Sequence, residues 1–384
     1  MERLQKLLNE ISANIDYFIS FAQSYFYSFT RYYSSSLRFN FYLEPQQRSS
    51  EFLEYIDNFW LAINYQNPVI QDMNIFIANH TLLVKTVASI VKNNVILNTS
   101  YQRFIFNQKI IAIQNDNISL FYPIVASGVE YPIFLKIDNN FFIINYKVND
   151  YNKEFLFRLI KEIYISYFEA DKWITYHGNS ILLPNHKAAI IMGLPNVGKT
   201  TLSTGLCYKG NSLYISDDRI MVKNAQSIAI PSAIYLDIKM IVKLKMESIL
   251  SNNDIKITFP RTKIPIRLIN KVNLFEHGYN LDDFLFKIGL FIIPQFNLNI
   301  DDKFYLHDVN EEVMINLLMN NCLSSKEIWR DQYMFNRYET YNLLMETCNA
   351  QIKNIIKNHK TLQIEFGPNV DYSILEEKIC NIEH

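Results

Sequence analysis

Residues 188–220 read AAIIMGLPNVGKTTLSTGLCYKGNSLYISDDRI. Within them, the octet from Gly193 to Thr200 satisfies the pattern G-x-x-x-x-G-K-[ST] at every fixed position. The pattern carries physical meaning only between a strand and a helix, and here an apolar run precedes it and a helical pattern follows it. The stretch therefore predicts a phosphate-binding loop.

The predicted loop would bind the phosphates of a nucleotide through its backbone and two side chains. Backbone N–H groups of the loop and the N-terminus of the following helix would converge on the phosphate oxygens. The ammonium group of Lys199 would reach the terminal phosphates, and the Thr200 hydroxyl would ligate Mg²⁺. The expected nucleotide-binding residues are Gly193, Leu194, Pro195, Asn196, Val197, Gly198, Lys199, Thr200 and Thr201.

Two adjacent carboxylates follow the loop at the end of the next predicted strand. Ser212–Ser216 is expected to form a strand beside the one that carries the loop, and Asp217 and Asp218 come directly after it. Where the chain leaves the sheet, both side chains can turn toward the crevice in which ligands of α/β proteins bind. One carboxylate would hold Mg²⁺, and the other would accept the proton of an incoming hydroxyl group.

The composition indicates a folded protein with a large core. The chain has 384 residues, of which 49% are hydrophobic, and it contains 27 Phe and 25 Tyr. Its formal net charge is −1, so we expect no nucleic-acid partner. No signal-peptide pattern begins the chain, and no uninterrupted apolar run approaches the roughly 18 residues that a membrane span requires.

The cysteines point to a reducing compartment. They are widely spaced and form no C-x-x-C pair, which is typical of reduced thiols rather than of a disulfide framework or a zinc site. The four positions are Cys207, Cys322, Cys348 and Cys380. We therefore expect a cytoplasmic protein, and the sequence leaves open whether identical chains associate.

We expect an α/β protein with two regions. Residues 1–150 are predicted to form an accessory region of helices and antiparallel strands, which would shape an acceptor site or hold a partner. Residues 151–384 are predicted to form the nucleotide-binding domain. In the first region, apolar spacing and β-rich runs between Asn/Asp turns predict helices at 2–30, 50–64 and 71–92 and an antiparallel meander from 103 to 147.

In the second region, helices and strands alternate around the loop, as in nucleotide-binding α/β domains. The predicted helices span 153–168, 311–319, 325–338, 341–357 and 373–382. The predicted strands span 173–176, 264–275, 285–293 and 362–366, with a strand–turn–strand over 228–238 around Pro231.

The order of these motifs resembles that of the HPr kinase/phosphorylase family. It is also similar to the broader group of HPr-kinase-related proteins, whose core resembles ATP-dependent phosphoenolpyruvate carboxykinase. The resemblance is carried by Tyr176-His177-Gly178, the loop ending in Lys199-Thr200, then Gly210, and Asp217-Asp218. The intervals of 16 residues from His177 to Gly193 and of 18 from Lys199 to Asp217 match those of the family to within about one residue.

The resemblance covers roughly residues 173–238 and implies an ATP- and Mg²⁺-dependent kinase. Its acceptor would be a serine hydroxyl in a protein, a peptide or free serine. On this basis the catalytic residues would be Lys199, Asp217, Asp218 and His177, with Thr200 and the aspartates as metal ligands. Thr200-Thr201 replaces the Ser-Glu of the bifunctional enzymes, which favours the related group.

Two other functions remain as alternatives. The residues of the loop, Gly-Leu-Pro-Asn-Val-Gly-Lys, also occur in P-loop GTPases. A GTPase, however, requires a D-x-x-G switch and an N-K-x-D motif that binds the guanine base. The sequence offers only Asn270-Lys271-Val272-Asn273, which lacks the guanine-pairing aspartate. The second alternative is a regulatory module that binds nucleotide without turnover.

Overall fold

The computed structural model describes residues 2–34, 37–45, 71–93, 100–105, 108–114, 118–123, 132–144, 150–228, 230, 233–252, 255, 261–270, 285–323 and 338–382. This part of the chain is a mixed α/β protein with mixed sheets. The described residues divide into two compact units, one up to Glu162 and the other from Ile163 onward. The division falls within helix α5 (Asp150–Ala170), which includes the helix predicted at 153–168. Each unit is described by itself.

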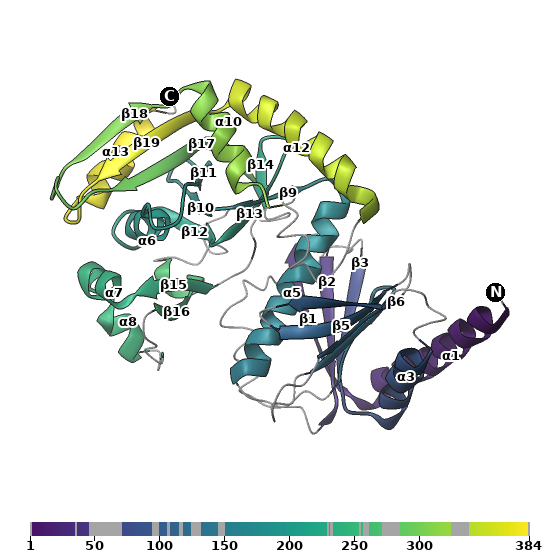
Figure 1. Cartoon of the computed structure of the whole chain (residues 1–384). Helices are drawn as coiled ribbons and strands as arrows, with labels where there is room; N and C mark the ends of the chain where they lie inside the picture. Colours follow the sequence, from purple (N-terminus) through teal and green to yellow (C-terminus); the bar gives the residue numbers. More distant parts are fainter. Residues whose placement is uncertain are drawn as a thin grey trace. The chain divides into compact units, whose positions relative to one another are not determined.

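A sheet with the strand order β1-β2-β3-β8-β7-β6-β5-β4 forms the first unit (Figure 1). Strands β4 to β8 pair antiparallel in chain order, which confirms the predicted meander. Strand β3 instead pairs in parallel with both β2 and β8. The strands are β1 (Tyr27–Ser34), β2 (Leu37–Leu43), β3 (Gln71–Ile77), β4 (Ser100–Ile105), β5 (Gln108–Gln114), β6 (Ile118–Pro123), β7 (Ile133–Ile137) and β8 (Asn140–Ile144).

Helices α1 (Glu2–Tyr25) and α3 (Thr81–Lys92) share one hydrophobic core with this sheet. Phe18 of α1 is fully buried, and its ring contacts those of Phe76 on β3 and Phe142 on β8. The apolar residues of α1 recur at helical spacing, so one face of the helix is buried.

Two helix predictions in this unit are wrong in part. The helix predicted at 2–30 ends at Tyr25, and β1 begins two residues later. Within residues 27–30 and again within 37–41, aromatic or aliphatic residues alternate with polar ones, which is a strand period. The helical spacing of the residues before Tyr27 obscured the first of these stretches. The single helix predicted at 71–92 is in fact the strand β3 followed by the helix α3. The helix predicted at 50–64 lies outside the described residues.

The second unit contains a sheet in the order β12-β10-β11-β17-β14-β13-β9, with β19 between β17 and β18. Strands β11, β17 and β19 are parallel, whereas β10 is antiparallel to both of its neighbours. The strands are β9 (Ile174–His177), β10 (Asn179–Leu182), β11 (Ala188–Ile191), β12 (Leu213–Ser216), β13 (Arg219–Lys223), β14 (Gln226–Ile228), β17 (Leu285–Phe296), β18 (Phe304–Asp308) and β19 (Lys360–Phe366).

Helices cover both faces of this sheet (Figure 1). Leu290 and Ile292 of β17 pack into the core with α6 (Lys199–Tyr208) and α13 (Tyr372–Ile382). Phe291 points to the other face, as the alternation along a strand requires, and its ring contacts His359. His359 directly follows α12 (Tyr338–Asn358), which packs against α10 (Glu311–Asn321).

The prediction that the strand ending at Asp217-Asp218 lies beside the loop strand is wrong. Strand β10 lies between β11 and β12 and pairs with both. All four of its residues are buried, so the alternation that marks a half-exposed strand is missing. Because β10 is antiparallel to each neighbour, β11 and β12 still run in the same direction.

Other predictions in this unit have mixed outcomes. The helices at 311–319, 341–357 and 373–382 and the strands at 285–293 and 362–366 are confirmed within longer elements. Of the strand–turn–strand predicted over 228–238, the second strand is confirmed as β15 (Ala233–Asp237), whereas β14 ends at the first residue of the predicted range. The prediction at 264–275 is wrong after Pro265, where β16 (Arg261–Pro265) gives way to α9 (Ile266–Ile269). Residues 271–275 and 325–337 lie outside the described part.

The four cysteines are free thiols, although two of them lie close together. The Sγ atoms of Cys322 and Cys348 are 2.9 Å apart and buried beside the hydroxyl of Tyr176. The contact with Cys322 and burial raise the pKa of the Cys348 thiol, so this thiol stays protonated at neutral pH.

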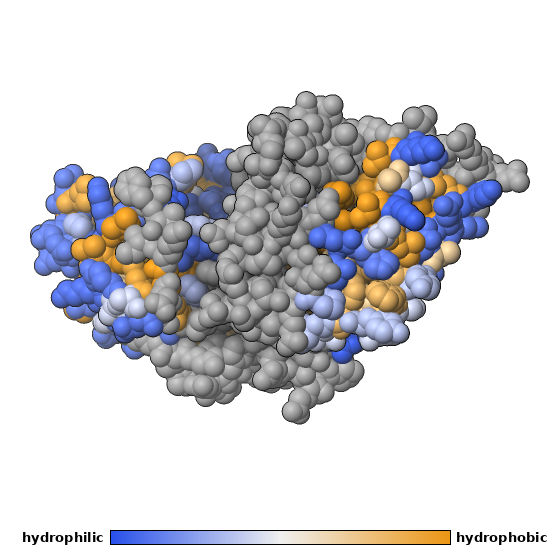
Figure 2. Space-filling view, turned by 90° about the horizontal axis from the view of Figure 1, so that it is seen from below, coloured by the Kyte–Doolittle hydropathy of each residue, from blue (hydrophilic) through white to orange (hydrophobic). Residues whose placement is uncertain are grey.

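On the face shown in Figure 2, the described residues present hydrophilic side chains interspersed with hydrophobic ones. Within these residues, no helix combines the length and apolar character that crossing a membrane requires.

Substitution of Gly205 tests the packing of α6 against α13. A Cβ atom added there would lie 2.1 Å from the ring of Tyr372. Alanine in a helix interior normally stabilises by about 0.5–1 kcal/mol relative to glycine. We expect Gly205→Ala instead to lower the free energy of unfolding by about 1–3 kcal/mol, because the core is overpacked.

Urea denaturation would measure this change. The double variant Gly205→Ala/Tyr372→Leu should lose less stability than the sum of the two single variants, because the two side chains are in contact. A stability gain from Gly205→Ala alone would contradict the packing.

Candidate functional site

The segments that carry the predicted site residues meet at one edge of the sheet in the second unit. Strands β11 and β12 both end there, and β10 begins there because it runs in the opposite direction. Asn179, the first residue of β10, is paired with Ile191, the last residue of β11. Its neighbour Ser180 is paired with Ser216, the residue before Asp217. The sheet therefore brings the loop and the two aspartates to the same edge.

The loop connects β11 to α6, which is the strand–loop–helix order that its sequence pattern predicts. Gly198 has φ = +100°, a value that disfavours any residue with a Cβ, and it precedes the first residue of α6. A Cβ at this position would also lie 2.9 Å from the Cβ of Phe296, at the end of β17. Leu194 is 68% exposed, so the outer part of the loop faces solvent.

The Lys199 side chain lies along the inside of the loop. Its Nζ donates hydrogen bonds to the carbonyl oxygens of Gly193 and Leu194 at 2.9 and 3.0 Å. Burial lowers the pKa of Lys199, while the charges of Asp218 and Asp217 oppose this by raising it. All three groups therefore act on one another electrostatically, as members of one site.

Asp217 is buried and held by a hydrogen-bond network. Its Oδ1 accepts a hydrogen bond of 2.8 Å from the hydroxyl of Tyr214 on β12. That hydroxyl lies 2.9 Å from Ser203 Oγ on α6 and 2.9 Å from Asn179 Nδ2. Burial, and then the charge of Asp217, raise the pKa of Tyr214 well above its usual range, so the hydroxyl keeps its proton and donates it.

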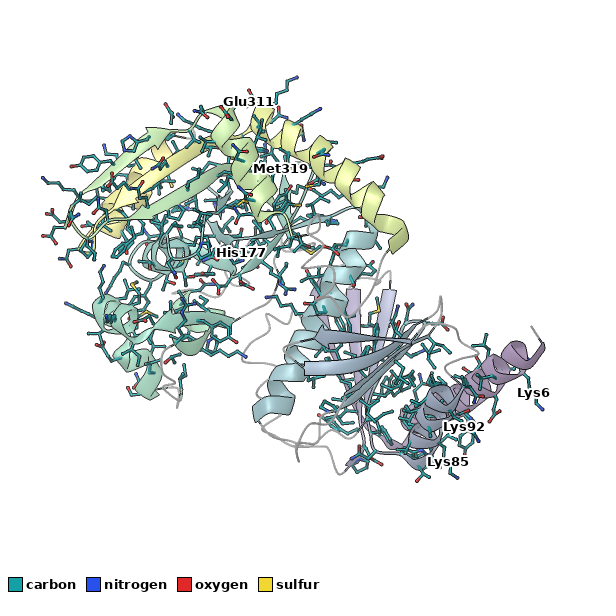
Figure 3. All side chains as sticks on the ribbon, viewed as in Figure 1. Lys6, Lys85, Lys92, His177, Glu311 and Met319 are labelled. Carbon is teal, nitrogen blue, oxygen red and sulfur yellow. The ribbon has the colours of Figure 1, made fainter. Side chains whose placement is uncertain are left out.

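Asp218 has different surroundings. Its side chain is 56% exposed, and its Oδ1 lies 3.3 Å from Nδ1 of His177. His177 is labelled in Figure 3. Its φ of +67° is a left-handed conformation that Asp tolerates better than most residues, and it turns the chain out of β12 into β13. Arg219 Nε lies 3.9 Å from the second carboxylate oxygen.

The chain around His177-Gly178 crosses the sheet beside the aspartates. Arg219 is paired with His177, and Gly178 donates a backbone hydrogen bond to the carbonyl of Asp218. A Cβ on Gly178 would lie 2.8 Å from the carbonyl oxygen of Ile191, so glycine allows this crossing to approach the end of β11. His177 therefore lies in the site, and the residue after it is glycine because a side chain there would clash with β11.

A second buried carboxylate, that of Glu376, binds the turn between α6 and β12 through hydrogen bonds. Glu376 of α13 accepts hydrogen bonds from the backbone N–H groups of Asn211 and Ser212 and from the Ser212 hydroxyl. Gly210 leaves room for it, because an added Cβ would lie 2.7 Å from Glu376 Oε1. These hydrogen bonds hold the beginning of β12 in place. They therefore also help to set the position of Asp217 and Asp218, which follow the strand.

The amide of Asn270 completes the edge of β12. Its Oδ1 accepts from the backbone N–H of Tyr214 at 2.6 Å, and its Nδ2 donates to the Tyr214 carbonyl at 3.2 Å. The Asn270 side chain thus makes the two hydrogen bonds to the Tyr214 backbone that a neighbouring strand would otherwise make. The remainder of the segment considered as a guanine-reading motif, residues 271–273, lies outside the described residues.

The structure brings together every catalytic candidate that the sequence singled out. His177, Lys199, Asp217 and Asp218 lie at one edge of the sheet, with Thr200 in the first turn of α6. The sequence reasoning missed Asn179, Ser203, Tyr214 and Glu376. These are common residues with no motif of their own, and only the spatial position of β10 and α13 reveals their contacts.

The available oxygen atoms fit a magnesium ion better than a protein-only metal cage. Among the described residues there is no group of three or more His, Cys, Asp or Glu side chains that could hold a metal ion. Mg²⁺ usually binds one or two carboxylates together with water and substrate phosphates. The hydroxyl of Thr200 and the carboxylates of Asp217 and Asp218 supply such oxygens beside the loop of residues 193–200.

Comparison of the chain with models of known protein families and with curated proteins finds no match. The function must therefore be argued from the chemistry of the site.

The electrostatic coupling within the site can be measured through Lys199. Because Asp218 is the stronger of the two charges that raise the pKa of Lys199, Asp218→Asn should lower this pKa further. Titration of the Lys199 side-chain NMR signals would measure the shift. Asp171→Asn is the matched control, because Asp171 pairs with Lys223 and not with Lys199. An unchanged pKa in both Asp217→Asn and Asp218→Asn would contradict a shared site.

Proposed function

We propose that this protein is an ATP- and Mg²⁺-dependent kinase that phosphorylates a serine hydroxyl, in a protein, a peptide or free serine. We further propose that residues 151–384 form a P-loop core of the HPr-kinase and phosphoenolpyruvate-carboxykinase type. The observation that supports this proposal is the joint placement of a loop with the G-x-x-x-x-G-K-[ST] pattern and two carboxylates in distinct surroundings. Phosphoryl transfer requires these parts, because its catalysis consists mainly of positioning and charge stabilisation.

In the proposed reaction, the loop and the N-terminus of α6 bind the nucleotide phosphates. Lys199 leaves the carbonyls of Gly193 and Leu194 and pairs with the terminal phosphates, which offer it stronger, charge-assisted hydrogen bonds. Thr200 and Asp217 would hold Mg²⁺, which supplies further charge neutralisation on the phosphates when bound.

Asp218 is the proposed general base. It is the more exposed of the two carboxylates, so an acceptor hydroxyl can reach it, and His177 lies within 3.3 Å. A base must lie within hydrogen-bond reach of the proton that it removes. His177 would orient this carboxylate and approach the transferred phosphoryl group.

The two alternatives have less support. For a GTPase, Asn270, which begins the candidate guanine-reading motif, has its amide engaged with the backbone of Tyr214. A module without turnover would not need an exposed carboxylate beside a histidine at the phosphate site. Both alternatives remain outcomes of the activity test.

Two substitutions separate nucleotide binding from chemistry. Lys199→Ala should reduce phosphoryl transfer to background, because the charge at the terminal phosphates is lost. Asp218→Asn should lower the turnover number by roughly 10²–10⁴-fold, the range for loss of a general base, with ATP affinity largely retained. Transfer would be measured with γ-labelled ATP, GTP or pyrophosphate against cell extract, free serine and serine-containing peptides.

Matched controls keep these results interpretable. Lys209→Ala, at the other end of α6, and Asp171→Asn should leave transfer unchanged. Unaltered transfer in both Lys199→Ala and Asp218→Asn would contradict the proposed site. Release of phosphate from GTP without an acceptor would favour the GTPase, and nucleotide binding without turnover would favour the regulatory module.

A further inference from the structure

One buried amide, that of Asn179, connects the phosphate-binding helix to both aspartates. The Asn179 side chain lies 2.9 Å from Ser203 Oγ and 3.5 Å from Thr200 Oγ1, both on α6. It also lies 2.9 Å from the Tyr214 hydroxyl, which binds Asp217. Asn179 is 1% exposed, so water does not compete for these contacts.

The donors and acceptors of this network match one another. The two protons of Asn179 Nδ2 can go to Ser203 Oγ and to the Tyr214 hydroxyl. Its Oδ1 accepts from the backbone N–H of Asp218 at 3.3 Å. The single hydroxyl proton of Tyr214 is then directed at Asp217 Oδ1, and the single proton of Ser203 at the Tyr214 hydroxyl, 2.9 Å away.

We propose that Asn179 and Tyr214 are positioning residues that fix Thr200 and the two aspartates at the separation that a phosphate-bound Mg²⁺ requires. This inference rests on the proposed function and deepens it. Neither side chain touches the metal or the nucleotide. Asn179 acts through α6 and through the backbone of Asp218, and Tyr214 acts through the carboxylate of Asp217.

The location of the network supports a role in positioning beyond simple stabilisation of the core. It joins side chains of three separate elements, α6, β10 and β12, and it ends on residues that face the phosphate site. Other buried hydroxyls on α6 and α13, those of Thr204 and Tyr372, have no hydrogen-bond partner among the described residues. The core therefore tolerates unpartnered hydroxyls, while those next to Asp217 are linked to one another.

Magnesium is demanding of such an arrangement because it requires near-octahedral geometry and short distances to oxygen. Loss of a residue that orients a metal ligand typically costs 10–100-fold in metal affinity or activity. Without the Tyr214 hydroxyl, the carboxylate of Asp217 loses a hydrogen bond that orients it, although its charge remains.

The test compares Tyr214→Phe with Tyr372→Phe. Each substitution removes one buried hydroxyl oxygen, but only the first hydroxyl belongs to the network. Binding of a fluorescent ATP analogue to the full chain is titrated at a series of Mg²⁺ concentrations and without Mg²⁺. In Tyr214→Phe, the Mg²⁺ concentration for half-maximal tightening should rise by roughly 10–100-fold, with metal-free affinity unchanged. Tyr372→Phe should match the natural chain.

If Tyr214→Phe is unstable, a second pair of variants tests the same inference. Ser203→Ala, within the network, should also raise the Mg²⁺ requirement, whereas Thr204→Val on the same helix should not. A Mg²⁺ requirement equal to that of the natural chain in both network variants overturns the inference while leaving the proposed kinase intact. Absence of any Mg²⁺-dependent nucleotide binding by the natural chain overturns the proposed function itself, and the inference with it.

Discussion

The buried amide of Asn179 lies between the helix that would hold phosphate and the strand that carries the aspartates. A buried amide is costly unless its donors and acceptors are satisfied, and its partners would be left unsatisfied without it. The contacts with Ser203 and Tyr214 therefore restrict both elements at once. In this protein the distance between the loop and the carboxylates depends on a side chain that belongs to neither of them.

Strand direction makes this arrangement possible. Because β10 runs antiparallel to β11 and β12, its first residue lies at the edge where those strands end. The chain crosses between strand pairs at residues 177–179 and again at 216–219, and these crossings are hydrogen-bonded to each other. Glu376 and Asn270 hold the beginning and the outer edge of β12. The exposed carboxylate of Asp218 thus lies in the turn between β12 and β13, each of which is hydrogen-bonded to a neighbouring strand.

The sequence was sufficient to place the loop of residues 193–200 between a strand and a helix, because its residues follow a fixed pattern. The loop can be predicted because phosphate binding demands glycines, lysine and a hydroxyl at set spacings. Strand β10 could not be, since its four buried residues show no alternation. Asn179 and Tyr214 carry no motif, and their importance arises from contacts across 24 to 35 residues of sequence. In the first unit, helical spacing in α1 hid the period of the first residues of β1 because aromatic residues satisfy both patterns for a short distance.

The central claim is that the loop and the aspartates form a single metal–nucleotide site. Anomalous diffraction from crystals of the chain grown with Mn²⁺ and a non-hydrolysable ATP analogue tests it directly. The account predicts an Mn²⁺ peak in contact with the nucleotide phosphates, between the hydroxyl of Thr200 and the carboxylate of Asp217 or Asp218. Phosphates bound away from the loop, or an Mn²⁺ peak with no oxygen of these residues as its ligand, would contradict the account.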